Sequence, residues 1–190
     1  MAIKTFVFEN QNDKEKHHSQ LLAALREYTG VDSAQILYTS KGKPYIKGLP
    51  EEKFMSITTA DEVMVCVFSD KPVGIDGERI NRLIDEGKEK KTDYTALAEK
   101  FFSEEEAEYV RDGDGDPERF VKVWVRKEAY VKYTGKGMSD FSNFSVSDGL
   151  KFLNKVGGVP IKKLNVCFPG SNEYLFVMAG EGEEVSSKEK

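Results

Sequence analysis

A helix-forming stretch at residues 124–132 places charges where a packed helix normally presents hydrocarbon. Trp124, Glu128 and Lys132 are spaced four residues apart, so they share one helical face with Val121 and Val125. Burying a carboxylate or an ammonium costs several kcal/mol unless each has a partner. The stretch therefore belongs either to a paired structural contact or to a chemical site. A surface Glu–Lys pair, worth only about 0.2–0.5 kcal/mol, is the simpler alternative.

The helix has clear ends and a basic environment. Pro117 at its first turn and Gly135 after its last predict a helix over residues 117–134. The net charge of −5 argues against broad nucleic-acid binding, whereas residues 119–136 hold one acidic and six cationic residues. This local field predicts a small polyanionic ligand. The cationic residues are Arg119, Lys122, Arg126, Lys127, Lys132 and Lys136.

A continuous apolar run at residues 63–68 predicts a strand that is buried on both faces. Residues 69–72 predict a turn, and residues 73–78 a returning hairpin partner. Its period of two puts Asp76 and Glu78 on the same side. Such a pair of oxygen ligands suits Mg²⁺, although polar residues leaving a hairpin explain an isolated D-x-E better.

The remaining patterns predict an α+β protein. Ser103 and Glu106 form a capping box at the start of one predicted helix. The charged residues 81–92 predict a short helix or a connector. Further strands are expected at residues 3–9, 35–39, 45–46, 54–59, 141–146, 150–153, 164–168 and 173–179, and further helices at 13–28, 94–102 and 103–110.

Several classes of protein are disfavoured by what the chain lacks. No apolar run is long enough to span a bilayer and no signal-peptide core is visible, so we expect a cytoplasmic protein without a membrane partner. Cys66 and Cys167 lie in separate apolar runs, which predicts reduced core thiols. His17 and His18 have no metal-ligand spacing and are expected to be exposed polar residues.

Several motifs occur together in one order. Gly42-Lys43-Pro44 is followed by a Ser/Thr segment, the buried strand, G-I-D-x-E, F-F-S-x-x-E and W-x-x-K-E-A-Y-x-K-x-x-G-x-G. This set resembles the 4′-phosphopantetheinyl transferases, specifically the larger monomeric type that activates peptide and polyketide synthetases. The resemblance covers residues 42–137, with a plausible continuation to the end of the chain.

The resemblance implies a fold of two similar α/β halves that form a pseudo-dimer within a monomer. The halves would be residues 1–79, with the D-x-E at their end, and residues 80–180, with the K-E-A motif; residues 181–190 are expected to be a disordered tail. Coenzyme A would lie in the cleft between the halves, where the Asp76 strand would face the Glu128 helix.

The resemblance also implies an activity. The family moves the phosphopantetheine arm of coenzyme A onto a serine of an acyl or peptidyl carrier protein and releases 3′,5′-ADP. Mg²⁺ would be held by Asp76, Glu78 and Glu128. Glu128 would also deprotonate the serine, and Lys132 would stabilise the leaving phosphate. The residues expected to contact coenzyme A are Lys43, Pro44, Thr58, Thr59, Asp76 and Lys132.

The chain departs from the family pattern on one side of the expected site. The family usually has a histidine before the buried strand, where this chain has Thr59, which donates one hydrogen bond without a charge. The basic residues that the family places before its first helix have no clear counterpart around residues 13–20. A diverged protein that binds coenzyme A or a carrier without catalysis is therefore an alternative, and a general phosphate-ester enzyme is a third.

Overall fold

The computed structural model describes residues 2–10, 13–80, 92–149 and 151–185. It contains two four-stranded sheets and a separate two-stranded hairpin. The first sheet has the order β10 (Glu183–Val185), β1 (Ala2–Glu9), β5 (Val63–Ser69) and β4 (Phe54–Ala60). The second has the order β6 (Val73–Arg79), β9 (Tyr174–Gly180), β8 (Val159–Lys163) and β7 (Lys155–Val156). The hairpin joins β2 (Gln35–Tyr38) to β3 (Pro44–Lys47).

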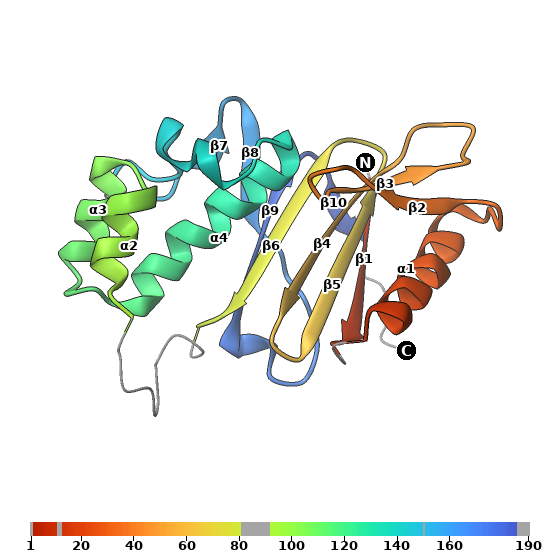
Figure 1. The fold of residues 1–190 in the computed structure, drawn as a ribbon, viewed down its shortest axis with the longest axis horizontal. Helices are drawn as coiled ribbons and strands as arrows, with labels where there is room; N and C mark the ends of the chain where they lie inside the picture. Colours follow the sequence, from red (N-terminus) through yellow and green to blue (C-terminus); the bar gives the residue numbers. More distant parts are fainter. Residues whose placement is uncertain (1, 11–12, 81–91, 150, 186–190) are drawn as a thin grey trace.

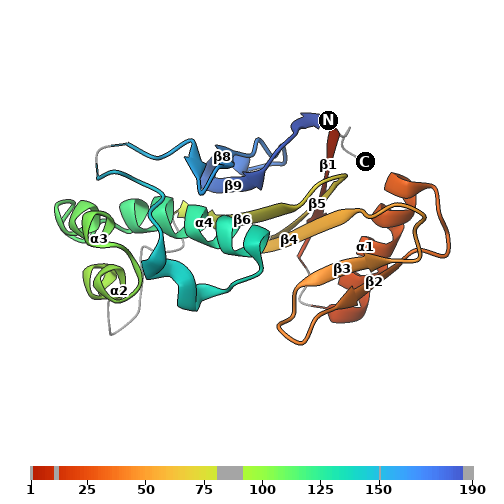
Figure 2. The ribbon, with the colours of Figure 1, turned by 90° about the horizontal axis from the view of Figure 1, so that it is seen from above.

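Helices cover the outer sides of the two sheets (Figures 1 and 2). α1 (Lys14–Thr29) and the β2–β3 hairpin share a core with β4 and β5. α4 (Pro117–Thr134) crosses β6 and β9 on the other side, with α2 (Tyr94–Phe101) and α3 (Glu104–Arg111) packed against it. Between the sheets lies a third core, to which both contribute. The mixed α+β class predicted from the sequence is therefore confirmed.

β5 is a central strand of the first sheet, and every one of its side chains is buried. Val65 and Val67 face the core between the sheets, whereas Met64, Cys66 and Phe68 face α1. Alternating side chains point to opposite faces of a strand, so a run that is apolar throughout must be covered on both sides. The predicted burial of residues 63–68 is confirmed.

β6 is not the hairpin partner of β5, and that prediction was wrong. It pairs antiparallel with β9 in the second sheet, with Asp76 opposite Val177. Its other edge faces β4. The hydroxyl of Ser56 accepts a hydrogen bond from the backbone N–H of Ile75 at 2.9 Å, and the hydroxyl of Thr58 accepts one from the backbone N–H of Gly77 at 3.1 Å. These two hydroxyls replace a backbone ladder, and we call this row of contacts the β4–β6 seam.

α4 approaches β6 closely because Gly74 has no side chain. A Cβ at this position would overlap the carbonyl oxygen of Ala129 and the amide nitrogen of Tyr133. Gly74 and Asp76 lie on the same side of β6, two residues apart. The contact therefore brings Asp76 against the surface of α4, where the sequence predicted that the two elements would meet.

The helices were predicted accurately, and after α4 the strand predicted at residues 173–179 is confirmed as β9, whereas others were wrong. α4 begins with Pro117 and ends before Gly135, which adopts a left-handed conformation with φ of 75°. Residues 141–146 were expected to form a strand, but η2 (Met138–Asn143) is a 3₁₀ helix. Residues 164–168 contain no strand either; Leu164 and Val166 are nevertheless buried in the core between the sheets.

The end of the chain is more ordered than expected. β10 runs parallel to β1, with Ala2 opposite Glu183, so the prediction of a disordered tail does not hold for residues 183–185. Residues 186–190, and residues 81–91 of the predicted connector, lie outside the described residues.

Two other expectations concern the chain as a whole. Cys66 and Cys167 are both free, but Cys167 is exposed rather than a core thiol. Within the described ranges, no helix is both long and apolar enough to cross a bilayer.

The β4–β6 seam can be tested by removing one hydroxyl. Ser56→Ala leaves the buried N–H of Ile75 without its acceptor, so we expect the free energy of unfolding to fall by about 1–3 kcal/mol. Equilibrium urea denaturation measures this change. Ser19→Ala, which removes a hydroxyl on the exposed part of α1, should change it by less than about 0.5 kcal/mol. Equal losses in the two variants would contradict the role of the seam.

Candidate functional site

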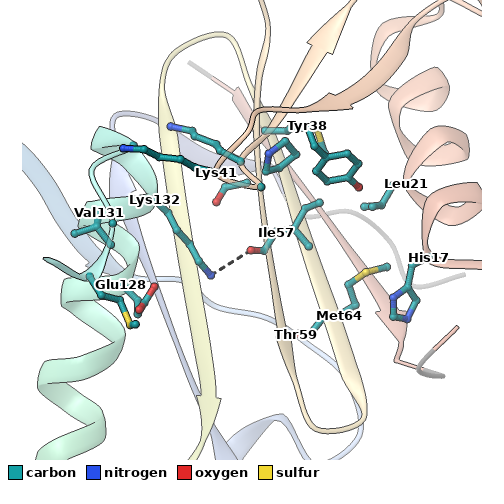
Figure 3. A pocket seen from close by; sticks show the side chains of 18 of the residues that line it. His17, Leu21, Tyr38, Lys41, Ile57, Thr59, Met64, Glu128, Val131 and Lys132 are labelled. Carbon is teal, nitrogen blue, oxygen red and sulfur yellow. Dashed lines mark hydrogen bonds between the residues drawn. The ribbon is translucent and has the colours of Figure 1, made fainter. Parts of the chain in front are cut away.

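A pocket of about 650 Å³ opens between α1, the β2–β3 hairpin, β4 and the C-terminal end of α4. Figure 3 shows Glu128, Val131 and Lys132 on one side of it and His17, Leu21 and Met64 on the other. Gly135, Lys136, Gly137 and Met138, which follow α4, complete its lining. The pocket is large enough for a ligand of nucleotide size.

The lining of this pocket is strongly basic. Its cationic residues come from α1, the β2–β3 turn, α4 and the segment after α4, whereas Glu128 is the one carboxylate in the lining among the described residues. Such a concentration of ammonium groups attracts a polyanion. The five lysines are Lys14, Lys41, Lys43, Lys132 and Lys136. Of the cationic residues that predicted an anion-attracting field, Lys132 and Lys136 are in this lining.

Asp76, predicted to contact the ligand, does not line this pocket; it is only 6% exposed and reaches the pocket through its bond to Lys132. Its Oδ1 accepts hydrogen bonds from Lys132 Nζ at 2.8 Å and Thr58 Oγ1 at 3.1 Å. Its Oδ2 is buried and has no hydrogen-bond partner among the described residues. Burial raises the pKa of this carboxyl group, although Lys132 and Thr58 act in the opposite direction.

Glu128 projects from α4 into the pocket and competes with Asp76 for the same ammonium. Its pKa is raised by burial and also by the negative charge of Asp76, and Lys132 only partly offsets this. Lys132 also donates to the carbonyl oxygen of Ile57 at 3.3 Å (Figure 3). Lys132 pairs with Asp76 and offsets only part of the effect on Glu128, so additional positive charge would be favourable here.

These observations fit a divalent cation bound by the carboxylates. Magnesium prefers carboxylate oxygens, and Oδ2 of Asp76 is a buried carboxylate oxygen without a hydrogen-bond partner among the described residues. Glu78 is half-buried and lies two residues after Asp76, on the same side of β6. The described residues contain no group of three or more His, Cys, Asp or Glu side chains already arranged around one point.

The other predicted contact residues fall into two groups. Lys43, Pro44 and Thr59 line the pocket. Thr58 does not line it; it is buried and bonded to Asp76 and to the amide of Gly77, so it acts on the site through Asp76. Lys43 Nζ donates to the carbonyl oxygen of Tyr133 at 3.2 Å, which joins the β2–β3 turn to the end of α4, and burial lowers its pKa.

The charged face predicted for α4 is divided between two environments. Trp124 belongs to an aromatic cluster with Phe120 and Phe141, and only Glu128 and Lys132 reach the pocket. The helix also carries a fully buried cation, Lys127, which the spacing of the charged face did not reveal. Lys127 is 0% exposed and forms an ion pair of 2.8 Å with Glu106, which is also 0% exposed. Glu106 was recognised in the sequence only as a capping residue.

The α1 side of the pocket was also missed. Lys14, His17 and His18 all line it; the expectation of an exposed side chain is confirmed for His18 and wrong for His17. His18 is exposed, but His17 is half-buried and its Nε2 is buried without a partner among the described residues. His17 and Leu21 are spaced four residues apart, which places them on one face of α1 and could have suggested their shared environment.

Comparisons with known proteins agree on one family. A family model described as the 4′-phosphopantetheinyl transferase superfamily matches residues 72–177. A 4′-phosphopantetheinyl transferase of Bacillus subtilis is 30% identical over 167 residues, which are 85% of this chain and 65% of the relative. The 4′-phosphopantetheinyl transferase Sfp of Bacillus subtilis (strain 168) is 30% identical over 145 residues, or 70% and 59% of the two chains.

A third relative is the 4′-phosphopantetheinyl transferase gsp of Aneurinibacillus migulanus, with 33% identity over 118 residues, or 60% of this chain and 44% of the relative. The chain thus spans between 44% and 65% of the length of these three curated relatives.

The raised pKa of Glu128 predicts how its charge affects stability. When the pKa of a carboxyl group is higher in the folded than in the unfolded protein, its ionisation destabilises the folded state. This destabilisation grows as the pH rises above the pKa in the unfolded chain, which is about 4.3 for glutamate. Glu128→Gln removes this penalty. We therefore expect the ligand-free variant to have a higher Tm than the unmodified protein at pH 7, and the difference to shrink towards pH 4. Differential scanning calorimetry across this range measures it.

Glu118→Gln is the matched control, because Glu118 is an exposed residue of the same helix that pairs with Lys122. It should show no gain in Tm that grows with pH. A Glu128→Gln variant that is less stable than the unmodified protein at pH 7 would show that the Glu128 charge is already compensated.

Proposed function

This chain belongs to the 4′-phosphopantetheinyl transferase superfamily, and we propose that it transfers the phosphopantetheine arm of coenzyme A to a serine of an acyl or peptidyl carrier protein, with release of 3′,5′-ADP. The observation that carries the proposal is that Glu128 and Lys132 face a pocket lined by five lysines, and that Lys132 is bonded to the buried carboxylate of Asp76 behind it. Coenzyme A carries a pyrophosphate and a further phosphate, and this lining suits such a polyanion.

Magnesium would be held by Asp76, Glu78 and Glu128, and the unpaired Oδ2 of Asp76 supports this set. When bound, the ion would neutralise charge on the pyrophosphate oxygens during phosphoryl transfer. The protein itself provides positioning. Thr58 fixes Asp76 through its hydroxyl, and the backbone of β6 is held by the β4–β6 seam.

Glu128 and Lys132 would act on the reacting groups. A carboxyl group with a raised pKa is a better base than an ordinary surface glutamate, so Glu128 is suited to accept the proton of the carrier serine. Lys132 would stabilise the charge on the leaving phosphate with its ammonium group. Lys43, Pro44 and Thr59, which face the same pocket, would contact the nucleotide portion of coenzyme A.

The fold is proposed to be a pseudo-dimer of two similar halves within a monomer. The arrangement of helix, sheet, sheet and helix supports this proposal, with α1 outside one sheet and α4 outside the other. By the same resemblance the protein would act on carriers of peptide and polyketide synthetases in the cytoplasm.

A second candidate function is binding of coenzyme A or a carrier protein without transfer. It is favoured by one observation, namely that uncharged Thr59 lines the pocket at the position where the family usually has histidine. Calorimetry would support this candidate if coenzyme A bound in the presence of Mg²⁺ while no carrier was modified.

The main proposal is tested by incubating the full chain with coenzyme A, Mg²⁺ and a panel of apo carrier proteins. Mass spectrometry should show a carrier that gains one phosphopantetheine arm, together with free 3′,5′-ADP. Binding of coenzyme A without modification of any carrier would reject the proposal. Release of 3′,5′-ADP without a carrier would instead indicate hydrolysis.

Replacing the proposed base should abolish most of the transfer. We expect Glu128→Gln to lower the rate by about 10²–10⁴-fold, because the amide cannot accept the serine proton. The rate of formation of modified carrier measures this effect, and circular dichroism checks the fold. Glu118→Gln should retain the unmodified rate. An active Glu128→Gln variant would remove Glu128 from the mechanism.

Metal binding should be visible as a gain in stability. At a free Mg²⁺ concentration about 100-fold above the dissociation constant, binding adds about 2.7 kcal/mol, which for a chain of this size raises Tm by about 5–10 °C. Asp76→Asn should lose most of this shift, because a neutral amide oxygen is a weaker ligand for a hard cation. Ca²⁺-free and Mg²⁺-free buffer gives the baseline. An undiminished shift would place the metal elsewhere.

A further inference from the structure

The ion pair between Glu106 and Lys127 is fully buried and uses every donor of the lysine. Lys127 Nζ contacts Glu106 Oε2 at 2.8 Å and donates to the carbonyl oxygens of Phe141 and Phe144 at 2.7 and 2.5 Å. An ammonium group has three N–H donors, so none is left for water. The nitrogen also lies 4.4 Å from the centre of the Phe144 ring. This is a closed polar junction in the core around α4.

Glu106 extends the junction to other backbone groups. Its Oε1 accepts from the amide of Val146 at 2.6 Å, and its Oε2 from the amide of Ser103 at 3.1 Å. The pair therefore joins three parts of the chain: the start of α3, the middle of α4 and residues 141–146. In the described part of the chain, residues 141–146 belong to no sheet, and these bonds from two side chains satisfy three of their backbone groups.

The junction bears on the pocket in two ways. Lys127 and Glu128 are consecutive, so holding Lys127 on the core side of α4 fixes the rotation of the helix that directs Glu128 into the pocket. Residues 135–138, which we call the rim, line the pocket and run directly into η2. The rim is held at one end by the bond from Gly135 N to Val131 O, at 2.7 Å, and beyond its other end by Lys127.

Stability alone does not explain such a pair. Desolvation offsets most of the attraction between buried charges, and apolar residues of similar volume commonly stabilise a protein as well or better. Both side chains are 0% exposed, so both charges are removed from water. What an apolar pair cannot do is bind the carbonyl oxygens of Phe141 and Phe144.

We propose that Glu106 and Lys127 are positioning residues, whose bonds to residues 141–146 hold the rim and Glu128 in the geometry that the pocket requires. The inference rests on the proposed transferase function, because it assigns the pair a part in that site. Neither residue lines the pocket, so neither is expected to contact the ligand.

The test is a double variant, Glu106→Gln/Lys127→Met, which removes both charges without leaving one of them buried alone. The amide introduced at position 106 can still accept the N–H of Val146, whereas the carbonyl oxygens of Phe141 and Phe144 lose their donor. We expect kcat for arm transfer to fall by about 10-fold or more while KM for coenzyme A changes by less than about 3-fold. The ¹³C-methyl NMR signal of Met138, which is 50% exposed on the rim, should broaden or split.

Val123→Ala is the matched control. Val123 is 0% exposed, lies one turn before Lys127 on the same face of α4, and its truncation destabilises the same core without touching the junction. It should retain the kcat and the single Met138 signal of the unmodified protein. A similar loss of kcat in this control would mean that any damage to the core has the effect, and would overturn the proposal.

Unmodified kcat and an unchanged Met138 signal in the double variant would also overturn it. If the unmodified protein transfers no arm, the proposed function fails but the Met138 signal still decides whether the pair holds the rim. If the double variant does not fold, Glu106→Gln/Lys127→Leu, which also leaves the two carbonyl oxygens without their donor, is measured in the same way. If the Met138 signal of this second variant matches that of the unmodified protein, the proposal is likewise overturned.

Discussion

The site depends on the β4–β6 seam, where two hydroxyl groups replace a backbone ladder between the sheets. Ser56 and Thr58 accept hydrogen bonds from the backbone N–H groups of Ile75 and Gly77. These bonds fix β6 on both sides of Asp76. Thr58 also donates to the carboxylate itself. Buried N–H groups must find acceptors, and here the acceptors belong to the opposite sheet. One row of hydrogen bonds thus joins the two sheets and orients the carboxylate of Asp76.

α4 serves the core on one side and the pocket on the other. Lys127 is closed into the core by Glu106 and two carbonyl oxygens, while Glu128 and Lys132 face the lysine-lined pocket. The two kinds of charge are handled differently. The core pair is fully satisfied, whereas Lys132 pairs with Asp76, and the pKa values of Asp76 and Glu128 are both raised. On α4, the carboxylate with a raised pKa is that of Glu128, and it lines the pocket, where a ligand can reach it.

The sequence predicted local structure better than it predicted pairing. Pro117 and Gly135 marked the ends of α4 because their backbone preferences act locally. The partner of β6 could not be found this way, because side-chain hydroxyls on β4 occupy the edge where a hairpin would have placed β5. Residues 141–146 were misassigned for a similar reason, since Lys127 takes the carbonyl groups that a strand would need. The motifs singled out Glu128 and Lys132, which both line the pocket, but the contribution of α1 depends on tertiary packing that no motif encodes.

The order of the strands has a consequence for synthesis on the ribosome. β6 emerges early but pairs with β9, and β1 gains β10 as a neighbour only late, since Ala2 lies opposite Glu183. Until then the nascent chain exposes two open sheet edges and the apolar side of β6. Such contacts between distant parts of the sequence fold slowly. These two edges would therefore be covered only once β9 and β10 have left the ribosome, and the early half would need protection from aggregation until then.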